Sequence, residues 1–308
     1  MSTLTLRHPV HTLDNRLLLP AGTVLSTETL DNLISSSKTT PSQSCSLLRY
    51  GSVKNDLLHF LSSSHIYQVI FSDQKQIADL LNLMEDVHSI LPVLQSLDYF
   101  MQYDLYTYSH ILVVFALSTL LARDLISDYH ERTLESAAGA THDFGKVCVP
   151  LHILKKSYPL TRDELSILKN HAPAGFVLLC YYLQDTQNFA AMVARDHHER
   201  RDGSGYPRGI QLTDSMIEIV AVSDIYDALI SSRPYRPVSY DNRTALEEIT
   251  RMAERKQISW DVLKALIAHN RKDKAHYREV AVSAEKRGTP PPGNAYGITR
   301  EENNHSPG

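Results

Sequence analysis

The sequence of 308 residues predicts an α+β chain, in which an all-α helical bundle follows a small α/β module. From about Leu91 onward, apolar residues recur at helical spacing almost everywhere. The preceding residues instead mix short apolar runs with turn residues, and the end of the chain has no apolar periodicity. We therefore expect three regions, which are a module over 1–88, a bundle over 89–286 and a disordered tail over 287–308.

Composition limits the function classes that fit this chain. Hydrophobic residues make up 43% and charged residues 21%, and the formal net charge is -4, so no bulk positive field indicates nucleic-acid binding. Cys45, Cys148 and Cys180 are isolated from one another, which argues against a disulfide framework or a thiolate zinc site. The chain shows no signal peptide and no apolar run of about 18 residues, so we expect a cytoplasmic protein without a membrane span.

The first region predicts a hairpin, a short helix, a strand and a second helix. The hairpin spans Val10 to Leu19, and Ser26 or Thr27 is expected to cap the helix that follows. A strand-like run from Ile66 to Phe71 precedes an amphipathic helix that begins near Gln76. No motif here identifies a ligand, so the module is expected to sense a signal, bind a partner or form an oligomer.

The second region predicts a series of helices. Thr161 is a natural N-cap, and Pro173 is expected to end the helix that Thr161 begins. The long helix after Tyr106 is apolar enough to be buried on most sides. The expected helices run over 91–101, 106–126, 131–144, 161–171, 175–183, 188–198, 217–230, 242–256 and 260–269.

Five consecutive residues from His142 to Lys146 combine an imidazole, a carboxylate and an ammonium group. Such a grouping can hold a metal ion and steady a phosphate. Imidazole and carboxylate are ligands that iron, manganese and zinc accept in hydrolytic sites. The further candidate ligands in the helical region are His110, His171, His197, His198 and Asp224.

One carboxylate among many imidazoles suggests a bridge between two ions. Asp143 is expected to offer one oxygen to each ion, and two ions about 3.5–4 Å apart lower the pKa of a shared water. Lys146 is then expected to neutralise a phosphate oxygen. Asp227, one turn after Asp224, is expected to orient a ligand histidine and to lie near the substrate.

Spacing alone leaves simpler roles open for these residues. His110 fits a hydrogen-bonded core histidine equally well. His171 can serve as a helix cap before a proline bend, and Asp224 can pair with a buried arginine.

A longer match narrows these alternatives. The stretch His197-His198-Glu199-Arg200-Arg201-Asp202-Gly203-Ser204-Gly205-Tyr206-Pro207 resembles the signature of the HD-GYP family, bacterial phosphodiesterases that open cyclic di-GMP. The resemblance covers roughly residues 95–270. It continues in four segments, which are His142 to Lys146, Asn170 to Ala172, Asp224 to Leu229 and Arg233 to Arg236.

The resemblance implies an HD-type bundle with a site for two divalent ions, iron first and manganese second. It implies that Lys146 and Asp143 act in catalysis, and that Arg233, Arg236 and Tyr206, beside Asp227, face the dinucleotide. The implied metal ligands are His110, His142, Asp143, His171, His197, His198 and Asp224.

One departure from the family pattern bears on the number of ions. Members with three metals have a glutamate four residues before the first histidine ligand, and Tyr106 stands there in this chain. A phenol is a poor replacement for a bridging carboxylate at neutral pH. We therefore expect two ions and prefer a single cleavage to pGpG, with GMP as the open alternative.

The sequence as a whole predicts a cyclic di-GMP phosphodiesterase that uses a hydroxide bound between two metal ions. Two alternatives remain, which are a weak or silent binding and protein-interaction module and an HD-type phosphohydrolase with another nucleotide substrate. GGDEF-type or other signalling proteins are candidate partners, and a homodimer is a candidate assembly.

Overall fold

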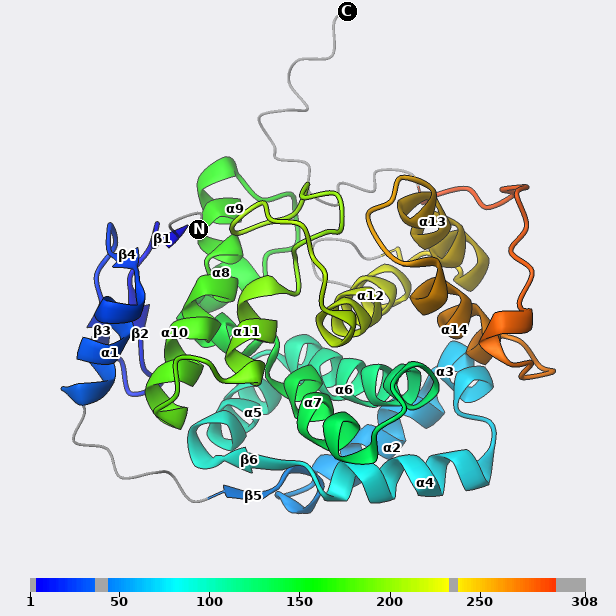
Figure 1. Ribbon diagram of the computed structural model, residues 1–308, viewed down its shortest axis with the longest axis horizontal. Helices are drawn as coiled ribbons and strands as arrows, with labels where there is room; N and C mark the ends of the chain where they lie inside the picture. Colours follow the sequence, from blue (N-terminus) through cyan, green and yellow to red (C-terminus); the bar gives the residue numbers. More distant parts are fainter. Residues whose placement is uncertain (1–3, 37–43, 233–237, 292–308) are drawn as a thin grey trace, which may run out of the picture.

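The computed structural model describes residues 4–36, 44–232 and 238–291, and these are mostly helical with a few short strands (Figure 1). This confirms the predicted fold class of a helical bundle preceded by a small α/β module. The predicted substrate residues Arg233 and Arg236, and most of the predicted tail, lie outside the described residues.

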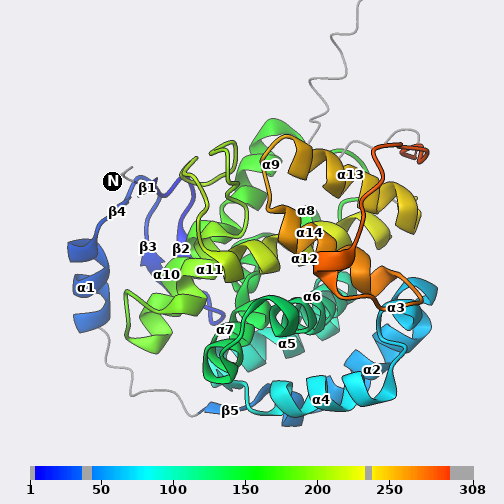
Figure 2. The ribbon, with the colours of Figure 1, turned by 45° about the vertical axis from the view of Figure 1, so that its right-hand side comes forward.

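The N-terminal strands and first helix form a small unit at one end of the molecule (Figure 2). Strand β1 (Leu4–Thr5) pairs antiparallel with β4 (Val24–Leu25), and β2 (Val10–His11) pairs antiparallel with β3 (Leu17–Leu19). Helix α1 (Thr27–Ser35) begins after Ser26, whose side chain accepts a hydrogen bond from a backbone N–H in the first turn. The predicted hairpin and cap are therefore confirmed. The unit shares a hydrophobic cluster with helix α10 (His171–Leu183).

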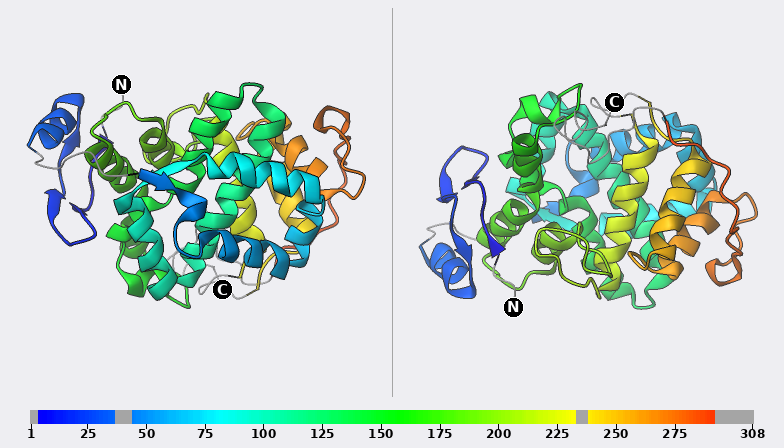
Figure 3. Two further views of the ribbon diagram at one scale, coloured as in Figure 1. Left: turned by 90° about the horizontal axis from the view of Figure 1, so that it is seen from below. Right: turned by 90° about the horizontal axis from the view of Figure 1, so that it is seen from above.

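Residues 44–90 cover another face of the bundle (Figure 3). Strand β5 (Ser44–Ser46) pairs antiparallel with β6 (His88–Ile90). Between them lie the 3-10 helix η1 (Leu47–Arg49) and helices α2 (Val53–Ser63), α3 (His65–Ile70) and α4 (Gln74–Glu85).

The predicted strand over Ile66 to Phe71 is wrong, because this run forms most of helix α3. The Ser64 side chain caps the helix by accepting a hydrogen bond from the Tyr67 N–H. Tyr67 and Ile70, three residues apart, then lie buried on one helical face. A short apolar run fits a strand and a buried helix equally well, and here the Ser64 cap and the burial of Tyr67 and Ile70 favour the helix.

Helices α2, α3 and α4 bury their apolar faces in the same core as the helices that follow. Leu57, Ile70 and Met84 belong to one hydrophobic cluster with residues of the later bundle as far as Val280. The predicted boundary near residue 88 stays a prediction, but the packing joins both sides of it.

The remaining helices follow in chain order. They are α5 (Leu91–Tyr103), α6 (Leu105–Leu125), α7 (Tyr129–Thr141), η2 (Phe144–Cys148), α8 (Leu151–Leu154), α9 (Arg162–Lys169), α10 (His171–Leu183), α11 (Phe189–Asp196), α12 (Ser215–Ile230), α13 (Asn242–Glu254), α14 (Trp260–Asn270) and η3 (Tyr277–Glu279).

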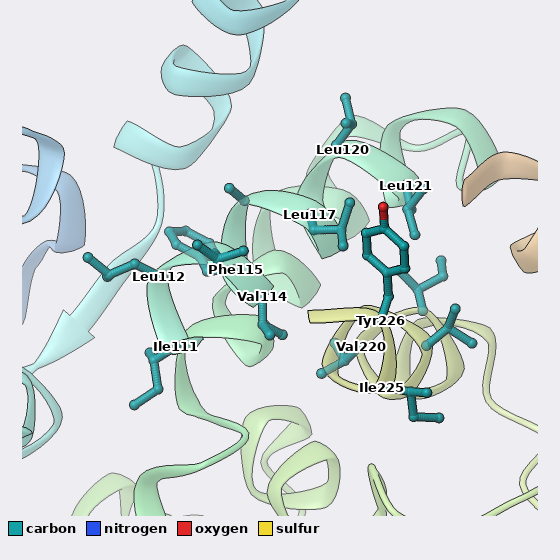
Figure 4. Close-up of a cluster of buried hydrophobic side chains, with 14 of the residues drawn as sticks. Ile111, Leu112, Val114, Phe115, Leu117, Leu120, Leu121, Val220, Ile225 and Tyr226 are labelled. Carbon is teal, nitrogen blue, oxygen red and sulfur yellow. The ribbon is translucent and has the colours of Figure 1, made fainter. Parts of the chain in front are cut away.

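Helix α6 is the centre of the bundle. It has 21 residues and is long and apolar enough to cross a membrane by length and composition, yet 83% of its most apolar window is buried inside the protein. A helix that is apolar on all sides is typical of a protein core. Figure 4 shows Val114 and Leu117 of this helix facing Val220 and Tyr226 of α12. This packing fixes the two helices that carry the first and last predicted ligands.

Several helix boundaries differ from the prediction by a few residues, and two of these differences lie at the site. The helix predicted to end at Phe144 ends at Thr141, so that Asp143 directly precedes the 3-10 helix η2 and Lys146 lies within it, rather than both lying on an α-helix. Pro173 does not separate two helices as predicted but lies in the first turn of α10. Proline is tolerated there, because the first N–H groups of a helix have no partner within it.

Candidate metal centre

Five separate parts of the bundle bring all seven predicted metal ligands to one place. Each ligand is buried except His198, which is partly buried. The ligands come from α6 (His110), from the junction of α7 and η2 (His142 and Asp143), from the start of α10 (His171), from the end of α11 (His197 and His198) and from α12 (Asp224).

The ligand atoms form two groups among the described residues. One group contains His171, His197 and His198, and the other contains His110, His142 and Asp224. Within each group the ligand atoms lie within 4.8 Å of one another. The groups are adjacent, because the rings of His142 and His197 have centroids only 5.2 Å apart.

The Asp143 carboxylate lies between the two groups. Its Oδ1 is 3.4 Å from His171 Nε2, and its Oδ2 is 3.4 Å from His142 Nε2 and 3.5 Å from His110 Nε2. One oxygen therefore faces each group. This is the arrangement that a carboxylate bridging two ions requires.

Backbone carbonyl groups orient three of the imidazoles. Nδ1 of His142 lies 2.8 Å from the carbonyl of Gly139, and Nδ1 of His171 lies 2.6 Å from that of Leu168. Nδ1 of His197 lies 3.0 Å from the carbonyl of Ala194. Since a carbonyl only accepts, each Nδ1 carries the proton and each Nε2 keeps a lone pair for a metal ion.

Burial keeps the imidazoles of the first group neutral. It lowers the pKa of His171, and together with electrostatic interaction with the neighbouring His142 and His171 rings it lowers the pKa of His197 to about 3. The pKa of His198 is also well below its usual value, first because of burial. Neutral imidazole is the form that binds metal.

Carboxylates surround the second group, which contains Asp224 and is flanked by Asp143 and Asp227. Burial raises the pKa of Asp143, but the Lys146 ammonium and nearby imidazoles lower it by more, so it stays well below its usual range. Burial lowers the pKa of His110, but the hydrogen bonds that its ring donates to the Asp224 and Asp227 carboxylates raise it to about 8. The buried Nε2 of His142 has no hydrogen-bond partner within the described residues. A divalent cation would satisfy that atom and balance these carboxylates, so the residues fit a metal ion.

A cavity of about 370 Å³ opens over the ligands. Its lining includes Asp143, Lys146 and Asp224, and Lys169 and Arg200 supply further positive charge. The apolar wall consists of Ile153, Leu154, Pro159, Leu160, Leu165 and Leu168. An apolar pocket with a few convergent charged groups is typical of a small-molecule site.

Tyr206 lies in this cavity, where the sequence predicts a substrate contact. Its ring stacks on the His198 ring at a centroid distance of 4.5 Å and an interplanar angle of 19°. The Lys169 ammonium lies 5.0 Å from the centroid of the Tyr206 ring. The tyrosine therefore lies between a candidate metal ligand and a cation that lines the cavity.

A family model described as HD domain matches residues 96–259, which is more than half of the chain. The chain belongs to the HD domain family. The matched range contains all seven ligands and every residue that lines the cavity.

The HD domain has several curated relatives. A "Cyclic di-GMP phosphodiesterase" of Thermotoga maritima is 34% identical over 66% of this chain and 55% of its own length. The "Cyclic di-GMP phosphodiesterase response regulator RpfG" of Xanthomonas campestris is 42% identical over 38% of this chain and 32% of its own length. The "3'3'-cGAMP-specific phosphodiesterase 1" of Vibrio cholerae is 35% identical over 42% of this chain and 30% of its own length.

These relatives confirm the predicted resemblance to the HD-GYP group. The chain spans about half the length of the first of them and a third of the others.

A buried glutamate holds the loop that follows the last histidines of the HD domain. Glu199 is fully buried, and its carboxylate accepts hydrogen bonds from the N–H groups of Arg208 at 2.7 Å and Ile210 at 3.1 Å. A Cβ on Gly205 would lie 2.4 Å from the His198 carbonyl oxygen, so the loop requires glycine there. These contacts hold Tyr206 against His198.

Sequence reasoning did not single out Lys169, Arg200 or Gln257, which line the cavity. Nor did it assign a role to Glu199. Their places in the sequence could have indicated a role. Lys169 and Arg200 each lie two residues from a predicted histidine ligand, and Glu199 lies within the family signature. Gln257 offered no such signal.

Asp227 does not line the cavity, although the sequence grouped it with substrate contacts. It is buried, and its Oδ2 lies 2.6 Å from Nδ1 of His110. Its other oxygen accepts hydrogen bonds from Tyr67 and Ser231. This position suits the orientation of a ligand histidine and leaves no atom of Asp227 for a substrate.

Tyr106, the residue that bears on the expected number of ions, lies next to His110. Its ring stacks on the His110 ring at a centroid distance of 5.7 Å and an interplanar angle of 12°. It lines the cavity beside Asp143 and Asp224. The phenol thus fills the space at the edge of the site without adding a carboxylate.

Proposed function

We propose that this chain is a metal-dependent phosphodiesterase that hydrolyses one phosphodiester bond of cyclic di-GMP and gives linear pGpG. One observation carries the proposal, which is that the two ligand groups face the Asp143 carboxylate in a cavity that Lys146 also lines. The names of the relatives support the substrate class.

Two divalent ions suit this donor set, with iron first and manganese second. The ligands are imidazoles and carboxylates without a thiolate, and each of the two groups offers three ligand atoms. When bound, such ions supply Lewis-acid stabilisation of a phosphate and lower the pKa of a coordinated water. Tyr106 in place of a third carboxylate supports two ions rather than three.

The chain's own cations and apolar wall suit a cyclic dinucleotide. Lys146 lies beside Asp143 and can neutralise the phosphate that is attacked. Lys169 and Arg200 also line the cavity and suit the second phosphate. The Tyr206 ring and the leucine-rich wall suit a guanine base, which stacks on aromatic and apolar surfaces.

The direct test is hydrolysis by purified protein loaded with Mn²⁺ or Fe²⁺. We expect pGpG from cyclic di-GMP as the main product, with slower turnover of 3'3'-cGAMP and none of a nucleotide monoester. Faster turnover of 3'3'-cGAMP would instead make 3'3'-cGAMP the preferred substrate, which is the substrate in the name of the Vibrio cholerae relative. Hydrolysis of the monoester alone would refute the diesterase proposal.

A second function, binding without turnover, is favoured by Tyr106. A site that lacks the third carboxylate of some family members has one ligand fewer to hold ions and orient substrate. Calorimetry that shows binding of cyclic di-GMP to the metal-loaded protein, with no product after prolonged incubation, would select this function.

Replacing Lys146 with methionine should lower the rate of cyclic di-GMP hydrolysis by about 100- to 1000-fold, the usual cost of removing one charge-stabilising donor. Methionine keeps much of the length of the side chain and removes its charge. Metal content, measured by elemental analysis, should stay at the wild-type value, because Lys146 is not a metal ligand.

Lys155→Met is the matched control, since this lysine is exposed and does not line the cavity. It should retain wild-type activity. An equal loss in both variants would show that general surface charge, and not Lys146, supports the reaction.

A further inference from the structure

A tyrosine from outside the matched HD domain reaches the metal centre. Tyr67 lies in helix α3, and its side chain is buried. Its hydroxyl donates a hydrogen bond of 2.6 Å to Oδ1 of Asp227, whose Oδ2 lies 2.6 Å from Nδ1 of His110. Two short hydrogen bonds therefore connect the segment before the family domain to a metal ligand.

The other end of α3 is held by a residue that follows the family domain. The Lys274 ammonium donates hydrogen bonds to the carbonyls of Val69 at 2.6 Å, Ile70 at 3.0 Å and His269 at 2.6 Å. Helix α3 lies against α14, as Figure 2 shows. Cations are favourable at the C-terminal end of a helix, where carbonyl groups have no partner. Helix α3 is thus held by Asp227, which lies inside the matched range of 96–259, and by Lys274, which follows it.

The contact at Asp227 leaves little freedom to its carboxylate. Oδ1 accepts hydrogen bonds from Tyr67 and, at 2.8 Å, from the Ser231 hydroxyl, while Oδ2 faces His110. Residues that hold a ligand histidine through its second nitrogen fix the ring and set its basicity toward the metal. A phenol is a donor at neutral pH and keeps this role across the physiological range.

We propose that Tyr67 is a positioning residue for the ion held by His110, His142 and Asp224, so that helix α3 completes one half of the metal centre. The proposal rests on the metal centre of the proposed function, but not on its substrate. It predicts that the two ions respond differently to a change at Tyr67, because the group of His171, His197 and His198 has no contact with Asp227 among the described residues.

The test is Mn²⁺ binding by the full chain carrying Tyr67→Phe, measured by isothermal titration calorimetry. Loss of the hydroxyl should weaken one of the two Mn²⁺ sites by about 10-fold, the lower end of the range for residues that hold metal ligands. The other site should keep its wild-type affinity. The visible absorption spectrum of the Co²⁺-loaded variant should change as well, since the His110 ring is less well fixed.

Tyr108→Phe is a matched control, because Tyr108 also joins the matched family domain to the segment that precedes it. The Tyr108 hydroxyl donates a hydrogen bond of 2.7 Å to Asp56, which joins α6 to α2 without touching a metal ligand. This variant loses the same type of hydrogen bond to an aspartate. It should retain both Mn²⁺ affinities, even if its thermal unfolding temperature falls as far as that of Tyr67→Phe.

Ser231→Ala is a second variant at the same carboxylate oxygen, and it removes a smaller group than a buried phenol. It should weaken the same Mn²⁺ site, which keeps the proposal testable if Tyr67→Phe does not fold. Unchanged Mn²⁺ affinities in both variants, or an equal loss in Tyr108→Phe, would overturn the role of Tyr67. Absence of Mn²⁺ binding by the wild-type chain would instead refute the metal centre itself.

Discussion

Replacing Asp143 with alanine should abolish hydrolysis of cyclic di-GMP, with a loss well above about 100-fold, and should reduce the metal content below two ions per chain. The reason is the position of this carboxylate, whose Oδ1 faces His171 and whose Oδ2 faces His110 and His142. Removal of the side chain takes one ligand from each group at once. Elemental analysis and product assays on one preparation measure both effects.

Asp79→Ala is the control for this prediction. Asp79 is an exposed aspartate of helix α4, far along the chain from the ligands. It should keep both metal content and activity. Turnover that persists unchanged in Asp143→Ala would contradict the bridging role and the proposed mechanism with it.

Gly145→Ala should also strongly lower the rate of cyclic di-GMP hydrolysis. It removes no ligand and acts only by displacing the backbone that positions the site. A Cβ at this position would lie 1.9 Å from the His171 carbonyl oxygen and 2.4 Å from the Gly175 backbone nitrogen. Both contacts are with backbone, so η2 and α10 must move apart. Overpacking of this kind costs about 1–3 kcal/mol of unfolding free energy. A displacement of about 1 Å between catalytic groups can lower the rate about 100-fold.

Denaturant unfolding and hydrolysis rates of the Gly145 variant separate the two effects. Gly22→Ala is a suitable control, because its φ of +83° also disfavours alanine but a Cβ there meets nothing within 4 Å. It should lose about 1 kcal/mol of stability and no activity. Wild-type turnover by Gly145→Ala would show that the close approach of η2 and α10 does not position the site.

Most of the candidate ligands could be identified from sequence because they lie in local patterns that match the family signature. His142 and Asp143 are adjacent, His197 and His198 form a doublet, and Asp224 begins a recognisable helical motif. The structure brings these residues together with His110 and His171. Helix α6 could also be predicted from the sequence, because a long apolar run indicates a buried helix.

What sequence reasoning missed depends on contacts between distant residues. The run at Ile66 to Phe71 fits a strand by local pattern, and only the Ser64 cap and burial of Tyr67 make it a helix. The contact between Tyr67 and Asp227 joins residues 160 positions apart. Neither hydrophobic periodicity nor motif spacing in the sequence can predict a contact between two residues so far apart in the chain. The same applies to Gln257, which reaches the cavity from beyond α13.

The 3-10 turn at η2 is a further case. A helical pattern that continues from 131 to 144 predicts one helix, but the observed helix ends at Thr141. The turn carries Asp143 toward both ligand groups and leaves Lys146 with its Nζ 2.6 Å from Asp143 Oδ2. The break in the helix therefore creates the geometry on which the site depends.

The central claim is that two ligand groups around Asp143 hold two metal ions. Anomalous diffraction at the manganese edge, from crystals grown with Mn²⁺, measures this directly. We expect two peaks, one among His110, His142 and Asp224 and one among His171, His197 and His198, with Asp143 in contact with both. A single peak away from Asp143, or none at these residues, would contradict the account.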